Sequence, residues 1–294
     1  MLESTQSLLT QFKALADPMR TRVVALCAVT ECSVSELTQV MALSQPRISQ
    51  HLKQLCQAAL LERFKDGHFV FYRVRSSGQG SASRRRLLAL LPDDDPQFAK
   101  DLAKLRSLRT DSASLPVTDA DRSLHRALVE LTVSRPLGDV IDIGCGSGRL
   151  LKLLASRAQR LVGVDIDSNA RQLARAELLL AGTSNTTLRQ GNMIALPFND
   201  GEFDTVILDD VFADADAETA QAAIREAKRL LAADGRLLLL ASVNGASLAD
   251  TRQHFSDWAA AAALRVTPPR SVPIKNPDWL LAVATRIDQS TIAA

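Results

Sequence analysis

The stretch from Val140 to Leu150, VIDIGCGSGRL, limits the fold of this chain more than any other. Its first residues form an apolar run, three glycines follow at alternate positions, and leucines then recur at helical spacing. A strand, a glycine turn and a helix in this order bring backbone N–H groups and a helix N-terminus close to a ligand. Asp165 ends the next apolar run, 17 residues after Gly148, where a carboxylate can accept both hydroxyls of a ribose. The pattern therefore predicts a nucleoside-binding α/β domain.

The spacing of the glycines separates two kinds of nucleotide motif. The dinucleotide-binding fingerprint has the form G-x-G-x-x-G, whereas this chain has D-x-G-x-G-x-G from Asp142 to Gly148. That variant resembles the class I S-adenosylmethionine-dependent methyltransferases. The resemblance implies that Asp142 reaches the methionine part of the ligand. A tight strand–helix turn without any ligand is the alternative.

The same resemblance covers residues 138–243 and implies further ligand contacts. The segment QGNMIALPFNDGEFDTVIL is similar to the stretch that surrounds adenine in this family, where Gly-Asp is usual and Gly191-Asn192 stands here. Asn192 keeps an oxygen acceptor for the adenine amino group but lacks the charge. The resemblance implies these ligand-binding residues: Asp142, Gly144, Gly146, Asp165, Ile166, Asn192, Met193 and Asp209.

From residue 121 onward the sequence alternates strand and helix patterns, as a doubly wound sheet requires. Strands are expected at 139–143, 161–165, 187–190, 203–208, 236–242 and 279–286. Helices are expected at 122–132, 149–158, 168–181, 217–232 and 248–262. The predicted class is α/β, with a Rossmann-like methyltransferase domain built on a seven-stranded sheet.

The first 75 residues have the pattern of short helices followed by a β-hairpin. Helical spacing over 8–29 is broken at Asp17-Pro18, where aspartate suits an N-cap and proline a first turn. A helix from about Ser35 to Leu43 precedes a second one, for which Ser44 is the expected N-cap. Two apolar strands then flank Asp66-Gly67, a strong hairpin signal.

The second helix combines an apolar stripe with a polar face. The stripe consists of Ile48, Leu52, Leu55, Cys56 and Ala59, and the polar side carries Arg47, Gln50 and Gln54, with His51 and Lys53 on the flank. A helix that buries one stripe and projects such side chains suits the major groove of DNA. The hairpin adds Arg63, Lys65, His68 and Arg73, which can contact phosphates. Together these elements predict a winged helix-turn-helix.

Residues 9–75 resemble the ArsR/SmtB group of bacterial repressors, on the stretch LSQPRISQHLKQL and the hairpin that follows it. The resemblance implies a homodimer that binds double-stranded operator DNA. The expected DNA-binding residues are Ser44, Gln45, Arg47, Gln50, His51 and Lys65. A winged helix that binds protein is the alternative, because the net charge of +2 alone does not argue for nucleic acid.

The cysteines argue against metal sensing. Metal and arsenic sensors of the ArsR group place a Cys-x-Cys pair where this chain has Ser33-Val34-Ser35, and the adjacent Cys32 is single. A thiolate site needs at least two converging ligands, so no metal is expected and Cys27 is assigned to the core. Four cysteines in 294 residues fit a reducing cytoplasm. We expect no membrane span and no signal peptide, because no eighteen-residue apolar run and no basic leader are present.

Three regions follow: a winged helix-turn-helix at 1–75, a linker at 76–120 and the methyltransferase-like domain at 121–294. Residues 76–86, SSGQGSASRRR, have the composition of a flexible linker. Phe98, Leu102, Leu105 and Leu108 then predict a helix that either joins a dimer or packs on the second domain.

The acceptor side of the second domain is poor in catalytic groups. It lacks an aromatic cage and an obvious base. Cys145, in the glycine turn, is the only cysteine of the whole second domain, which excludes a resemblance to arsenic methyltransferases. The whole chain resembles ArsR-type regulators fused to a methyltransferase-like domain, some of which respond to S-adenosylhomocysteine. The resemblance implies a repressor that senses S-adenosylhomocysteine or S-adenosylmethionine in the methionine cycle. An active S-adenosylmethionine-dependent methyltransferase with an unknown acceptor is the alternative.

Overall fold

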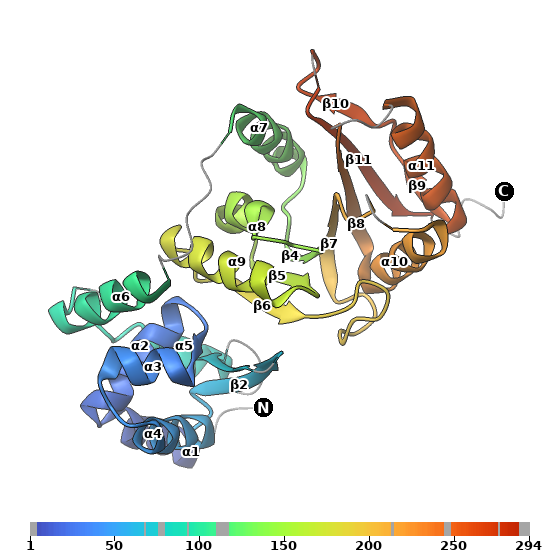
Figure 1. Ribbon diagram of the computed structural model, residues 1–294. Coiled ribbons are helices and arrows are strands. Elements are labelled where there is room, and N and C mark those ends of the chain that lie inside the picture. Colours follow the sequence, from blue (N-terminus) through green and yellow to red (C-terminus); the bar gives the residue numbers. More distant parts are fainter. Residues whose placement is uncertain are drawn as a thin grey trace. The chain divides into compact units, whose positions relative to one another are not determined.

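The computed structural model describes residues 5–67, 69–75, 80–92, 94–109, 118–212, 215–243, 248–275 and 277–287 (Figure 1). Contacts between residues divide the chain into two units. The first consists of Met1–Ser114 with Arg175–Ser184, and the second of Leu115–Ala174 with Asn185–Ala294. Across the described residues, no helix is long and apolar enough to cross a membrane.

The first unit is mainly helical. In chain order its elements are α1 (Thr5–Leu15), α2 (Pro18–Val29), β1 (Cys32–Ser33), α3 (Val34–Met41), α4 (Gln45–Gln57), β2 (Leu61–Asp66), β3 (Phe69–Val74), α5 (Ser81–Leu88) and α6 (Pro96–Arg109). The three strands form a small antiparallel sheet in the order β1-β3-β2. Two helices followed by a hairpin confirm the predicted winged helix-turn-helix.

Local chemistry fixes where these helices begin. Asp17 caps α2, as predicted, because its carboxylate accepts the Arg20 N–H at 2.9 Å. A capping box between Ser33 and Glu36 starts α3 one residue earlier than expected. Ser44 occupies the N-cap position of α4 with an extended backbone, as predicted, although its side chain makes no capping hydrogen bond.

Helix α4 buries three residues of the predicted stripe in the core of the first unit, whereas Cys56 is half-buried and Ala59 lies beyond the end of the helix. Ile48, Leu52 and Leu55 are at most 1% exposed. They belong to a cluster with buried residues of α2 and α3, such as Val23 and Leu37. Burial of this stripe leaves the opposite face of α4 to solvent, which is the arrangement that the helical spacing predicts.

The hairpin turn lies one residue later than predicted. Asp66 pairs with Phe69 in the strand register, so Asp66 ends β2 and Gly67, with a φ of +60°, follows it in the turn. His68, predicted to lie on the wing, falls outside the described residues. Arg73 donates to Glu62, which reduces its availability for a phosphate.

The segment after the wing is more ordered than its composition suggests. Residues 81–88 form α5, and Arg84, the first of the three arginines, is buried and donates to the Arg75 carbonyl at 3.0 Å. The predicted helix with leucine spacing is α6, which packs on α2 and α3. Asp101 of α6 receives two 2.7 Å hydrogen bonds from Arg22 of α2. Helix α6 is therefore part of the first unit.

The second unit contains one large sheet and its helices. Its elements are α7 (Asp119–Ser134), β4 (Asp139–Ile143), α8 (Arg149–Leu154), η1 (Ala155–Arg157), β5 (Arg160–Asp165), α9 (Ser168–Leu180), β6 (Thr186–Gln190), β7 (Phe203–Asp209), α10 (Ala217–Leu230), β8 (Leu231–Ser242), α11 (Leu248–Ala261), β9 (Leu264–Val266), β10 (Arg270–Val272) and β11 (Trp279–Arg286). The end of α9 is counted with the first unit. The strand order is β10-β11-β8-β7-β4-β5-β6, and β9 also pairs with β11.

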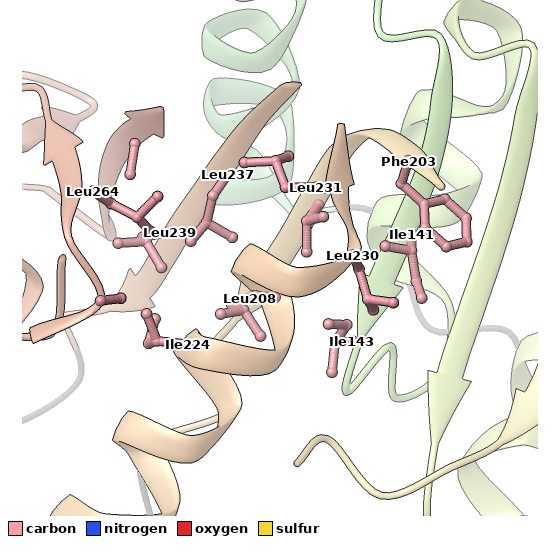
Figure 2. Packing of buried hydrophobic residues seen from close by; sticks show 14 of the residues in the cluster. Ile141, Ile143, Phe203, Leu208, Ile224, Leu230, Leu231, Leu237, Leu239 and Leu264 are labelled. Atoms are coloured by element: carbon pink, nitrogen blue, oxygen red, sulfur yellow. The ribbon is translucent and has the colours of Figure 1, made fainter. Parts of the chain in front are cut away.

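Helices cover both faces of this sheet. Ile141 and Ile143 of β4 share one buried cluster with Ile224 of α10 and Phe255 of α11, and Figure 2 shows part of this packing. A Cβ atom at Gly163 of β5 would instead collide with Leu151 of α8. Because neighbouring strand residues face opposite sides, α8 lies on the other face. The doubly wound α/β architecture is confirmed.

Two features of the sheet differ from the prediction. Helix α10 ends at Leu230 and β8 begins at once, with a register shift against β7, whereas the sequence predicted a helix up to residue 232 and a strand from residue 236. The sheet has eight strands where seven were expected, because the short strands β9 and β10 both pair with β11. Sequence periodicity is weak over three-residue strands, which explains why these two were not predicted.

Candidate functional site

The glycine loop lies at the carboxyl end of β4, where the strand order reverses. The chain moves from β4 to β5 and β6 on one side and then returns to β7 on the other. Ligands of open α/β sheets bind at such a switch point. Gly144, Gly146 and Gly148 have φ values of +77°, +52° and +80°. A side chain at Gly144 would also collide with Val211, so this loop needs glycine for both its conformation and its packing.

Asp165 is held against the glycine loop. It is the last residue of β5, which pairs in parallel with β4. One carboxylate oxygen accepts the Gly146 N–H and the other accepts the Asp167 N–H, both at 2.8 Å. Ile166, the expected wall for adenine, follows with 67% exposure. An acidic acceptor and an exposed apolar side chain thus stand side by side at the loop.

Asp142 is a buried carboxylate without a partner. The residue is 1% exposed, and its Oδ1 atom makes no hydrogen bond to any described group. Burial raises the pKa of Asp142 well above its ordinary value, and the charges of Asp209 and Asp165 add to this rise, whereas Arg149 opposes it. A buried charge of this kind is costly unless a cationic or hydrogen-bonding group compensates it.

Asp209, at the end of β7, belongs to a network that the sequence did not reveal. Its Oδ2 atom lies 2.6 Å from Nη2 of Arg149, whereas its Oδ1 atom is buried without a partner in the described structure. Arg149 also reaches Asp121 of α7 at 3.3 Å and lies 4.3 Å from the ring centroid of Trp279. Burial raises the pKa of Asp209 although Arg149 lowers it. The sequence offered one indication that Arg149 belongs to the site, namely its position directly after the last glycine of the loop.

The expected adenine-binding pair lies after β6. The Oδ1 atom of Asn192 accepts the Ile194 N–H at 3.2 Å, so it already uses one lone pair within its own turn. Met193 is half-buried and packs against the core of the second unit. Both contacts with adenine therefore stay predictions.

The structure brings three of the predicted acids to one edge. Asp142, Asp165 and Asp209 come from β4, β5 and β7, which are neighbours in the sheet. Parallel pairing places the carboxyl ends of these strands together. The edge can therefore hold a ligand with hydroxyl groups on one side and a cationic group on the other.

The predicted DNA-binding residues lie on α4 and β2. Ser44, Gln45, Arg47, Gln50 and Lys65 are exposed. His51 is half-buried, and its charge helps to lower the pKa of Asp17, so it also faces the start of α2. Gln54, on the same side as Arg47, is engaged with Arg20 at 2.6 Å. Of the polar side chains on this face of α4, Gln54 is thus already engaged within the first unit.

Two of the three cysteines of the first unit are buried, and Cys56 is half-buried. Cys27 is 3% exposed, which confirms its place in the core, and Cys32 is fully buried in β1. Within the described ranges no three His, Cys, Asp or Glu side chains are grouped so that they could hold a metal ion.

Fold and site define two classes of domain, a winged helix-turn-helix and a class I methyltransferase fold, and comparison with known families agrees. The model for bacterial regulatory proteins of the arsR family matches residues 17–63. The model for a methyltransferase domain matches residues 141–239. The chain is therefore an ArsR-type DNA-binding regulator domain joined to a methyltransferase domain.

Individual relatives match one half of the chain at a time. The arsenic resistance transcriptional regulator ArsR1 of Pseudomonas putida is 47% identical over 64 residues, which are 21% of this chain and 50% of the relative. A demethylmenaquinone methyltransferase of Symbiobacterium thermophilum is 26% identical over 154 residues, 51% of this chain and 61% of the relative. The first curated relatives are thus matched over 36% to 61% of their length.

Solved structures of methyltransferases are similar to part of this chain. One is a TehB-like S-adenosylmethionine-dependent methyltransferase from Corynebacterium glutamicum, with a TM-score of 0.45 and 18% identity. The match covers 66% of this chain and 100% of that structure.

Proposed function

We propose that this protein is a transcriptional repressor whose methyltransferase domain senses S-adenosylhomocysteine or S-adenosylmethionine and thereby controls genes of the methionine cycle. In this proposal it binds operator DNA as a homodimer and acts in the cytoplasm, where the chromosome lies. The observation that carries the proposal is the combination of an exposed polar face on α4 with an intact ligand edge. At that edge Asp165 is fixed to the loop by Gly146, and Asp142 is buried without a partner.

The ligand edge supports a nucleoside with a cationic amino-acid tail. A carboxylate offers about four lone-pair sites, so Asp165 can accept two ribose hydroxyls while it keeps its two backbone donors. The unpartnered atoms of Asp142 and Asp209 lie at the neighbouring strand ends, where an α-ammonium group would compensate their charge. S-adenosylhomocysteine and S-adenosylmethionine both carry a ribose and an α-ammonium group.

Calorimetric titration of the full chain with each of the two ligands tests this part of the proposal. Saturable one-to-one binding of at least one of them is expected. If neither ligand bound, the second unit would be a methyltransferase fold without its ligand, and the proposed sensing function would be wrong.

The contribution of Arg47 to DNA recognition can be predicted. If Arg47 donates two hydrogen bonds to a guanine edge, Arg47→Ala is expected to weaken operator binding by about 1–3 kcal/mol and to relax specificity at one position. Arg47→Lys keeps the charge but not the paired donors, so it is expected to relax specificity as well. Fluorescence anisotropy with the protein's own promoter and with random duplex DNA gives both affinities.

Arg265→Ala removes an equally exposed charge from β9 and serves as the control. Equal weakening of Arg47→Ala on promoter and random DNA would assign Arg47 to the phosphate backbone. If the unsubstituted protein showed no preference for the promoter at any salt concentration, the repressor proposal would fail.

A second candidate function is an active methyltransferase. It is favoured by two buried polar atoms next to Arg149, Oδ1 of Asp209 and Nε1 of Trp279, which lack partners among the described groups. Such atoms can position an acceptor group. The test is to incubate the protein with radiolabelled S-adenosylmethionine and cell extract. Transfer of the labelled methyl group to a defined acceptor would show that the protein is an enzyme and not only a sensor.

A further inference from the structure

An open cavity of about 930 Å³ lies in the second unit, and none of its lining residues belongs to the glycine loop. Its walls come from one side of α7, from β10 with the residues that follow it, and from Arg252 of α11. None of the sequence motifs pointed to this place, because its residues come from three segments that are far apart in the chain.

The charge of the cavity is positive. Four arginines line it, Arg122, Arg126, Arg252 and Arg270, whereas only two carboxylates do, those of Asp119 and Glu130. Guanidinium groups hold carboxylates and phosphates through paired N–H donors. Because the arginines outnumber the carboxylates, the cavity attracts an anion.

Some of the donors in the cavity are already engaged and others are not. Arg270 lies 3.4 Å from Glu130 and donates to the Ala127 carbonyl at 2.8 Å. Arg122 forms an ion pair with Asp119. Arg252 donates one hydrogen bond, to Ser271 at 3.0 Å. Arg126 is exposed and contacts no acceptor within the described ranges. Arg126 and the rest of Arg252 are thus available to a ligand.

The other lining residues make part of the cavity apolar. Ala127 and Val272 are buried, and Pro273 and Ile274 follow directly, with Ile274 90% exposed. An exposed isoleucine beside free guanidinium groups offers an apolar surface to a ligand that also carries a charge. An inorganic ion would leave this surface in water.

The cavity adjoins the acceptor end of the proposed nucleoside site. Val272 pairs with Trp279 in the β10–β11 register. The ring of Trp279 in turn lies against Arg149. In addition, Asp119 and Arg122 lie in the same turn of α7 as Asp121, the partner of Arg149. A ligand in the cavity would therefore lie next to the network around Asp209.

We propose that this cavity binds a small organic anion, with a carboxylate or phosphate group on Arg126 and Arg252 and an apolar body on Val272 and Ile274. The proposal does not depend on nucleoside binding or on DNA binding, because none of these four residues belongs to either site.

Titration calorimetry of the full chain with phenyl phosphate and benzoate tests the proposal, with benzyl alcohol as the neutral analogue and chloride keeping the ionic strength constant. Both anions are expected to bind one to one, and benzyl alcohol is not. Arg126→Ala is expected to weaken binding about tenfold, since one charge-assisted hydrogen bond is lost. The double variant Arg126→Ala with Arg252→Ala is expected to abolish binding. Arg265→Ala is the control and keeps wild-type affinity.

Several outcomes would overturn the proposal. If neither anion bound, or if chloride displaced them at equal concentration, the cavity would not be a specific site. If inorganic phosphate bound as tightly as phenyl phosphate, the apolar part would be wrong. If the double variant lost affinity for random duplex DNA while phenyl phosphate did not bind, the arginines would serve a nucleic acid backbone instead. Binding of S-adenosylhomocysteine, measured on the same samples, tests the proposed sensing function independently of the cavity.

Discussion

Asp165→Ala is expected to weaken the binding of S-adenosylhomocysteine by a factor of at least about one hundred, since each hydrogen bond to a charged group contributes roughly 1.5–3 kcal/mol and two are lost. In the unliganded chain this carboxylate accepts the N–H groups of Gly146 and Asp167. Because both donors lie in the loop at the sheet edge, alanine leaves them to water and the domain stays folded. Calorimetry on the full chain measures the loss.

Asp257→Ala is a suitable control for this variant. Asp257 is an exposed acid on α11 that contacts Gln253, so its loss changes the net charge equally without reaching the sheet edge. Circular dichroism of both variants should match that of the wild type. If Asp165→Ala retained affinity within about threefold while the wild type bound, Asp165 would not hold the ribose and the proposed ligand geometry would be wrong.

Asp142→Asn is expected to act in opposite directions on stability and on ligand binding. The carboxylate of Asp142 is buried without a partner, so its neutral isostere should stabilise the unliganded second unit by about 1–2 kcal/mol. The same change removes the charge that would face the α-ammonium group, and the affinity for S-adenosylhomocysteine should fall about tenfold. Hydrogen–deuterium exchange in β4 and β5 reports the stability of this unit separately from the first.

The pH dependence of that stability follows from the raised pKa of Asp142. A carboxyl group with a higher pKa in the folded chain favours folding when it is protonated, and this contribution is lost as the pH rises through the folded pKa. The wild type should therefore be less stable than Asp142→Asn above that pKa, and the difference should shrink as the pH falls through it. A difference that stayed constant or grew on acidification would show that burial of the charge is not the cause.

The parts of the fold that sequence reasoning predicted are those set by local chemistry. Asp17-Pro18 marked the start of α2, and the leucine spacing of α4 marked its buried face, because capping and helical periodicity act over a few residues. The spacing in α6 predicted the helix but not its buried face, since Asp101, Leu105 and Arg109 are buried whereas Leu108 is 37% exposed. The capping box of Ser33 and Glu36 was equally visible in the sequence but was not used. The flexible composition of residues 81–88 was misleading, since packing of Arg84 and Leu87 overrides it.

The candidate site was predicted only where one motif contained it. Asp142, Gly146 and Asp165 follow from a single strand–turn–helix unit, so their meeting at the sheet edge could be expected. The partnership of Arg149 with Asp121 and Asp209 joins residues up to 60 positions apart and depends on how α7 packs. The arginine cavity joins α7, β10 and α11 in the same way. Such contacts are decided by tertiary packing, which the one-dimensional pattern does not encode.

In the proposed function, the ligand edge and the DNA-binding helix act on each other. A ligand changes operator affinity only if it binds one of two states of the protein more tightly, and coupling between two sites typically amounts to about 5–150-fold. The most direct measurement is a titration of the protein's own operator by fluorescence anisotropy, with and without saturating S-adenosylhomocysteine, on the wild type and on Asp165→Ala. We expect operator affinity to shift at least about fivefold, in either direction, and the shift to disappear in Asp165→Ala. An unchanged operator affinity at saturating ligand in the wild type would rule out the proposed sensor, however tightly the ligand binds.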